Sequence, residues 1–242
     1  MFLIRNLILA TGALDIQDRL IEKIIGSVKN QYEIGVRIEA PASAFGNILS
    51  THGDLKLKCG SGRTYCVTAN GKIISYQTGG AMFLEGSMES SETTGYTNLA
   101  VLVKCNDDKE ICHFFKRYYE DFRGLPVKQR LVDYINGKIS NNTINATLTS
   151  AVYGDINTLF PTSINDMIKE FIYDVIIGAM GIAKDVVVGV APELKIVRNL
   201  QFGENFELDR NFFVIGAATG KFRGILQSFC SGVRCGQLLG RE

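Results

Sequence analysis

Two segments, one near each end of the chain, place small residues directly after an apolar run. Residues 7–10 (LILA) lead into Thr11 and Gly12, and residues 211–215 (NFFVI) lead into Gly216. A continuous apolar run is typical of a strand buried on both faces of a parallel sheet. Glycine after such a strand lets the backbone approach a ligand bound at the carboxyl ends of the strands. The alternative is an ordinary tight turn that ends a strand.

Charged residues in the middle of the chain offer weaker candidates. Arg37 and Glu39 alternate along a predicted strand and can face a substrate, but a solvated cross-strand pair is the favoured interpretation. His113 lies in a helical stretch between Cys112 and Phe114. No serine or cysteine is placed to form a nucleophilic pair with it, so a helix-surface histidine is expected.

The cysteines are spaced too irregularly to predict a metal site. No two of them form a C-x-x-C pair, and the chain has only two histidines, His52 and His113. A zinc site needs three or four converging ligands, usually with a close-spaced pair. Free thiols in a reducing compartment are therefore expected of the six cysteines, Cys59, Cys66, Cys105, Cys112, Cys230 and Cys235.

Composition excludes several classes of partner. Of the 242 residues, 46% are hydrophobic and 21% are charged, so the chain can bury a sizeable core. The net charge is +1 and no basic run occurs, so neither nucleic acid nor a membrane is an expected partner. Arg5 and Asn6 interrupt the apolar amino terminus, and no stretch reaches the roughly 18 apolar residues of a membrane helix. A cytoplasmic protein is expected.

Each of the two terminal segments is predicted to be a strand, a glycine turn and a helix. After residues 7–12, apolar residues recur at helical spacing from Ile16 to Ile25, and Gly26 is a credible stop. After Gly216, apolar positions from Ile225 to Leu238 mark a final amphipathic helix.

The middle of the chain has a different pattern. Over residues 34–104, short β-like runs separated by glycines predict a mostly antiparallel sheet. Asn70 and Gly71 between two of these runs predict a hairpin. Residues 109–136 and 163–181 have helical spacing.

The predicted fold class is α/β, or α+β overall, in two domains. Residues 1–33 and 191–242 form a first domain in two pieces, and residues 34–190 form an inserted domain of antiparallel sheet and helices.

Seven segments of the chain together resemble a family of uncharacterised FAD-dependent dehydrogenases among the two-dinucleotide-fold flavoproteins. The first looks like the "ATG" strand of these proteins, and the last looks like their final FAD-contacting strand. Each motif alone is weak, and their order and spacing carry the resemblance. The segments are residues 7–12, 34–39, 63–66, 96–100, 124–130, 191–193 and 211–220.

The resemblance implies an FAD cofactor and hydride transfer between the flavin and an organic small-molecule substrate. The inserted domain would cover the flavin ring and select the substrate, and Arg63, Tyr65 and Cys66 can line the ring, with an ordinary strand as the alternative. The implied cofactor-binding residues are Thr11, Gly12, Gly216, Ala217, Gly220, Arg223, Gly224 and Ile225.

The last three of these residues would open the final helix. In the resembling family, its amino end points at the pyrimidine side of the flavin. Gly224 and Ile225 would supply N–H donors that stabilise negative charge there, and Arg223 would add charge or steer the substrate.

Two departures from the family pattern limit these expectations. The strand, G-x-G-x-x-G turn and helix that hold the FAD diphosphate do not occur, and only six residues precede Leu7. Ala217 stands where the family has an aspartate for the ribityl hydroxyls, a loss of roughly 1.5–3 kcal/mol. The expected fold is therefore a truncated Rossmann-like FAD-binding domain.

Two hypotheses follow. The chain is either an oxidoreductase that a separate amino-terminal FAD-binding chain or upstream sequence completes, or a non-catalytic remnant that does not bind FAD alone. A third hypothesis is a stand-alone β-rich binding module. It leaves the strand–glycine–helix segments at both ends of the chain unexplained.

Overall fold

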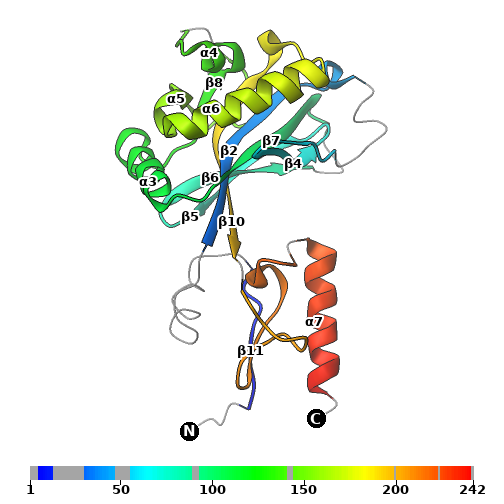
Figure 1. Cartoon of the computed structure of the whole chain (residues 1–242). Helices are drawn as coiled ribbons and strands as arrows, with labels where there is room; N and C mark the ends of the chain where they lie inside the picture. The colour runs from blue at the N-terminus through cyan, green and yellow to red at the C-terminus, as the bar shows by residue number, and fades with distance from the viewer. Residues whose placement is uncertain are drawn as a thin grey trace. The chain divides into compact units, whose positions relative to one another are not determined.

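The computed structural model has a mixed α/β fold made of two compact units (Figure 1). One, which we call the terminal unit, combines Met1–Gln31 with Ile196–Glu242, and the inserted unit is Tyr32–Lys195. The boundaries between the two units lie within five residues of the domain boundaries predicted from the sequence. The structure describes residues 5–12, 30–46, 55–88, 93–140, 144–198, 200–222 and 224–240.

The terminal unit contains a three-stranded sheet in the order β1-β12-β11, with β1 at Leu7–Leu9, β12 at Phe212–Val214 and β11 at Glu207–Asp209. β1 and β12 pair in parallel, which places the two terminal segments in one sheet, as expected of one domain in two pieces. β11 pairs with β12 in antiparallel orientation. The helix predicted from Ile16 to Ile25 lies outside the described residues.

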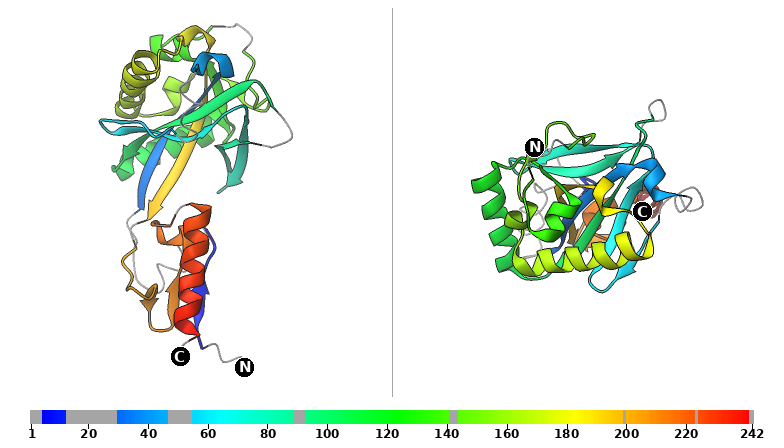
Figure 2. Two further views of the ribbon diagram at one scale, coloured as in Figure 1. Left: turned by 90° about the vertical axis from the view of Figure 1, so that its right-hand side faces the viewer. Right: turned by 90° about the horizontal axis from the view of Figure 1, so that it is seen from above.

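Helix α7, Ile225–Leu239, lies beside the strands of this unit (Figures 1 and 2). Its buried face carries Ser231 and Cys235, and Cys235 packs in one cluster with Phe213 and Phe206. The predicted helix is therefore present, but most of its apolar residues point away from this core. The exposed fractions are 94% for Ile225, 73% for Leu226, 68% for Phe229 and 45% for Val233.

The inserted unit is built on a seven-stranded sheet in the order β3-β4-β7-β2-β10-β8-β9. Most of its pairs are antiparallel, as predicted, but β8 and β9 are parallel. The strands are β2 Asn30–Pro41, β3 Lys58–Cys59, β4 Gly62–Thr68, β7 Tyr96–Cys105, β8 Val127–Arg130, β9 Val152–Tyr153 and β10 Val188–Arg198.

A separate two-stranded ribbon, β5 (Lys72–Thr78) and β6 (Ala81–Ser87), turns at Gly79 and Gly80. The predicted hairpin at Asn70-Gly71 is wrong. The chain does turn at Asn70, which has a φ of 52°, but β4 pairs with β3 and β7, and β5 pairs with β6 instead.

Helices cover one face of the seven-stranded sheet. Helix α6, Thr162–Phe171, packs against β4 and β7 (Figure 2), where an added Cβ on Gly62 would lie 2.5 Å from the Phe171 ring. A π-helix, Ile172–Ala179, continues α6. The remaining α-helices of the inserted unit are α3 Asp108–Phe122, α4 Leu131–Asn136 and α5 Ile156–Leu159.

The predicted helical stretch 109–136 is interrupted. Arg123 and Gly124 adopt left-handed backbone angles, with φ of 54° and 68°, and end α3. Residues Val127–Arg130 then form β8 before α4 begins. In the described part of the chain, no helix combines the length and apolar character that crossing a bilayer requires.

Candidate functional site

The parallel pairing of β1 and β12 brings the two predicted glycine segments to one edge of the terminal unit. Leu9 is paired with Val214, and the amide of Ile215 donates to the carbonyl of Leu9 over 3.0 Å. Gly12 and Gly216 follow at the carboxyl ends of the strands, and both have left-handed backbone, with φ of 79° and 65°. This is the edge at which parallel sheets bind ligands.

The turn after β12 is held by Thr219, a residue that the sequence analysis did not single out. Its side chain is completely buried, and its Oγ1 donates to the carbonyl of Gly216 over 2.7 Å. The same oxygen accepts from the amides of Lys221 and Phe222 at 3.0 and 3.2 Å. The Ser/Thr preference for turns was the available signal.

The other two predicted residues of this turn have structural contacts. The amide of Gly220 donates to the carbonyl of Ala217 over 3.0 Å, and Gly220 has a φ of 75°. Ala217 is partly exposed. No acidic side chain occurs in the turn from Gly216 to Phe222 to replace the aspartate that the family has at residue 217.

Helix α7 is fixed against this turn by two serines. The amide of Gly216 donates to Ser231 Oγ over 2.9 Å, and a Cβ on Gly216 would lie 3.5 Å from the Cβ of Ser228. Ser228 Oγ donates to the carbonyl of Phe222 over 2.7 Å. The turn and the first half of the helix are therefore one packed assembly.

The amino end of α7 presents helix N–H groups and no acidic side chain. Gly224 is its N-cap, Ile225 is its first residue, and its first turn contains no acidic side chain. The first N–H groups of a helix lack partners within the helix and carry partial positive charge. However, the amide of Gly224 donates to Gln227 Oε1 over 3.2 Å, so a ligand would compete with Gln227 for that donor. Arg223 lies outside the described residues.

In the inserted unit, four of the segments that carry the family resemblance meet at Arg37. This side chain is fully buried, and its Nε and Nη2 donate to the two carboxylate oxygens of Glu193 over 2.7 and 2.8 Å. Its Nη1 donates to Asn98 Oδ1 over 2.7 Å and to the carbonyl of Cys66 over 3.2 Å. The interpretation of Arg37 as one of a solvated pair is wrong. Its partners lie up to 156 residues away in the sequence, beyond the reach of local patterns.

Glu39 is also buried rather than solvated. Its carboxylate accepts hydrogen bonds from the amide of Thr147, over 2.7 Å, and from the Thr147 hydroxyl. Burial raises the pKa of Glu39, while the bonds to Thr147 and the charge of Arg37 oppose this. Burial would lower the pKa of Arg37, but Glu193 reverses this and raises it.

Cys66 lies at a bulge in β4, where the pairing with β7 shifts between Tyr65 and Thr68. Its φ is 49°, which is unusual for a residue with a side chain and is held here by the bond from Arg37 to its carbonyl. Strained residues of this kind cluster at active sites and ligand clamps. Cys66 itself is partly exposed.

Lys195 lies at the end of the same buried network. Its Nζ is 3.3 Å from Glu85 Oε1 and 3.8 Å from Glu193 Oε1. It also lies 5.3 Å from the ring centre of Tyr65 and 5.9 Å from that of Tyr76. Burial would lower the pKa of Lys195, but Glu193 and Glu85 raise it, so this amine stays protonated and is not a nucleophile.

Arg63 and Tyr65, which the resemblance implied could line a flavin, are partly exposed on β4. Arg63 pairs with Glu33 through two hydrogen bonds, and its guanidinium lies 4.8 Å from the ring centre of Tyr65. Tyr65 therefore lies close to two cations, Arg63 and Lys195. Both cations already have carboxylate partners.

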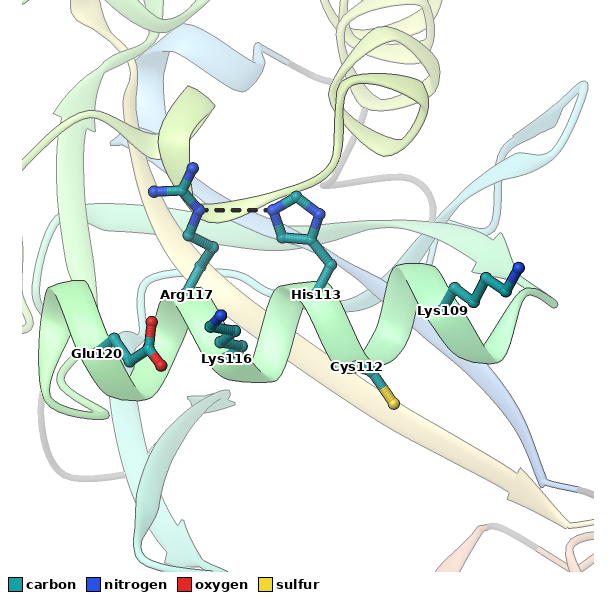
Figure 3. A pocket seen from close by; sticks show the side chains of 6 residues that line it. All are labelled: Lys109, Cys112, His113, Lys116, Arg117 and Glu120. Atoms are coloured by element: carbon teal, nitrogen blue, oxygen red, sulfur yellow. Dashed lines mark hydrogen bonds between the residues drawn. The ribbon is translucent and has the colours of Figure 1, made fainter.

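A shallow hollow of about 550 Å³ lies on the surface of α3 (Figure 3). Its lining residues all belong to that one helix, so no groups converge on it from a second element. They are Lys109, Cys112, His113, Lys116, Arg117 and Glu120. His113 is exposed and accepts a hydrogen bond from Arg117 Nε over 3.5 Å, which confirms that it is a helix-surface histidine.

None of the six cysteines is in a disulfide. The residues that the structure describes contain no group of three or more Cys, His, Asp or Glu side chains that could hold a metal ion. No protein-family model matches the chain, and no curated protein sequence matches it significantly.

Proposed function

We propose that the chain is the carboxyl-terminal part of an FAD-dependent oxidoreductase. In this proposal the terminal unit holds the flavin half of FAD, and the inserted unit selects a small organic substrate. Bound FAD would accept or donate the hydride, so that substrate and flavin exchange two electrons. The observation that carries the proposal is the parallel pairing of β1 and β12, with Gly12 and Gly216 both in left-handed conformation beyond their carboxyl ends.

The residues of the terminal unit fit one half of the cofactor. The Gly216 turn lets the backbone come close to a ribityl chain, and the first turn of α7, free of acidic side chains, suits the negative charge of a reduced flavin. The other half is not matched, because the sequence contains no G-x-G-x-x-G turn and Ala217 has no carboxylate. The proposal therefore includes a partner, either upstream sequence or a separate chain, that supplies the diphosphate-binding helix.

Apolar surface on the terminal unit supports such a partner. β1 is the last strand in the sheet order of the described residues, and its Leu7 and Ile8 are 42% and 43% exposed. Ile225, Leu226 and Phe229 on α7 are more exposed still. An open strand edge and an apolar helix face are surfaces that proteins normally cover.

The second candidate is a non-catalytic remnant of such a protein, and Ala217 together with the missing G-x-G-x-x-G turn favours it. The visible spectrum of the purified chain, before and after addition of FAD, separates the two. A yellow protein, or flavin bands that shift on addition of FAD, supports the oxidoreductase. A colourless protein that leaves the FAD spectrum unchanged supports the remnant.

The substitution Ile225→Pro tests the role of α7. Proline is well tolerated at the first position of a helix, so the change removes one N–H while the helix remains. We expect flavin affinity to fall about tenfold or more, the effect of losing a charge-assisted hydrogen bond. Ile225→Ala keeps the N–H and is the matched control. Equal affinity of the two variants would exclude Ile225 as a flavin donor.

A further inference from the structure

A second hollow, of about 440 Å³, lies entirely within the inserted unit. It is formed where β2 and β8 end and where β7 and β10 begin, together with two loops. Its volume lies within the range of small-molecule sites. The lining residues are Pro41, Tyr96, Arg130, Ile144, Asn145, Asp185, Val186, Val187 and Val188.

Two opposite charges line this hollow without neutralising each other. Arg130 is the last residue of β8 and is partly exposed, and Asp185 is exposed in the 3₁₀ turn Lys184–Val186. Among the described residues, neither side chain has a hydrogen bond or ion pair, and the two do not pair with each other. Both charges are therefore available to a ligand that enters the hollow.

The rest of the lining mixes aliphatic and polar side chains. Pro41, Ile144 and the valines 186–188 supply aliphatic surface, and Tyr96 and Asn145 supply polar groups beside it. A further hollow of about 330 Å³ shares Pro41 and Val186 with the first, so the two adjoin. The additional residues of this further hollow are small, namely Ser43, Ala44, Gly181 and Ala183.

From these features we infer that the hollow binds a zwitterionic amino acid with an apolar side chain. The carboxylate would pair with Arg130, the ammonium with Asp185, and the side chain would extend along Val186 toward the adjoining hollow. Arginine is the residue best suited to binding a carboxylate through two hydrogen bonds. A simple anion would meet the charge of Asp185 and a simple cation that of Arg130, so a ligand with both charges fits best.

The site goes beyond the proposed flavin function and does not depend on it. Pro41 is at the opposite end of β2 from Tyr32, where the chain enters the inserted unit. The nine residue steps from one to the other correspond to roughly 30 Å of strand. The inference can therefore be tested on the purified chain with no flavin present.

The test is calorimetric titration of the full chain with three probes. L-Phenylalanine has both charges, N-acetyl-L-phenylalanine lacks the ammonium, and phenethylamine lacks the carboxylate. We expect L-phenylalanine to bind about tenfold or more tightly than either analogue. Arg130→Met should remove the preference over phenethylamine, and Asp185→Asn should remove the preference over the acetylated probe.

Lys184→Met is the matched control, because it removes a charge next to Asp185 from a residue outside the hollow, and it should bind as the unmodified chain does. Circular dichroism of each variant verifies its fold. The inference is overturned if no probe binds at millimolar concentration, if the three probes bind equally, or if the two variants bind L-phenylalanine as tightly as the control.

Discussion

The guanidinium of Arg37 and the carboxylate of Glu193 form a two-pronged ion pair in which neither side chain has exposed surface. The two residues belong to β2 and β10, the strands in which the chain enters and leaves the inserted unit. The same guanidinium also binds Asn98 and the backbone of Cys66. One side chain therefore ties together four strands of this unit, β2, β4, β7 and β10.

Arg37→Met should destabilise the protein by about 3–5 kcal/mol, because it leaves the Glu193 carboxylate buried without a partner. Urea unfolding measures the change. Arg117→Met is the matched control, since it breaks an exposed pair with Asp121 on α3 and should cost about 0.5 kcal/mol or less. If Arg37→Met and Arg117→Met lose similar amounts of unfolding free energy, the buried network around Arg37 adds little to stability.

The double variant Arg37→Met, Glu193→Leu should lose less stability than the sum of its single variants, because both buried charges are removed together. A double-mutant cycle from the same urea data gives the coupling between the two residues. Strict additivity would mean that the pair is not coupled in solution.

Gly86 approaches this network closely enough to forbid a side chain. A Cβ at this position would lie 2.1 Å from Thr68 Oγ1 and 2.5 Å from Arg37 Nη1. Gly86→Ala should therefore cost about 1–3 kcal/mol of stability. Gly236→Ala in α7 is the contrasting control, because no atom lies within 4 Å of its added Cβ and alanine favours a helix. The prediction is wrong if Gly86→Ala is as stable as the unmodified chain.

Glu39 should make the free energy of unfolding depend on pH, in a direction that follows from its raised pKa. The pKa of Glu39 is raised in the folded state. The stabilisation that protonated Glu39 gives to the folded protein is therefore fully present below the pKa of the unfolded state. It is lost as pH rises through the pKa of the folded state. Glu39→Gln can keep both contacts with Thr147 without ionising. Between mildly acidic and neutral pH, the unmodified chain should lose stability relative to this variant. If the urea midpoints of the unmodified chain and of Glu39→Gln change in parallel across that pH range, the raised pKa of Glu39 is wrong.

Five of the six cysteines should react with iodoacetamide in two groups. Burial raises the pKa of the Cys105 thiol to about 11, and Cys235 is buried with a pKa raised for the same reason. Mass spectrometry of the native protein at neutral pH should find Cys59, Cys112 and Cys230 alkylated first, since they are exposed. Rapid modification of Cys105 would contradict its position in the core.

Local patterns in the sequence predicted that the two terminal segments form strands. They did not predict that β11 pairs with β12 in antiparallel orientation, or that Leu7 and Ile8 of β1 are exposed. The apolar runs before Gly12 and Gly216 fix where each strand ends, and each run spans only a few consecutive residues. The buried network around Arg37 was missed because alternating charges on a strand look the same whether they are solvated or paired. Only the sheet order reveals that Glu193 lies opposite.

The two errors in secondary structure have the same origin. Asn70 does turn the chain, but β5 then pairs with β6 and not with β4, and this choice of partner is not encoded next to the turn. Helical spacing continues past Arg123, yet this residue and Gly124 take left-handed angles and end α3. In the candidate site, Thr219 was missed because its role depends on being completely buried beneath the Gly216 turn.

We propose that the Gly216 turn and α7 hold the flavin half of FAD. The decisive experiment is a fluorescence titration of the purified chain with riboflavin 5′-phosphate, with ADP as competitor. We expect the flavin to bind, ADP not to displace it, and Gly216→Val to weaken binding because valine is strained at a φ of 65°. Flavin fluorescence that does not respond to the protein, or binding that Gly216→Val leaves unchanged, would exclude this role.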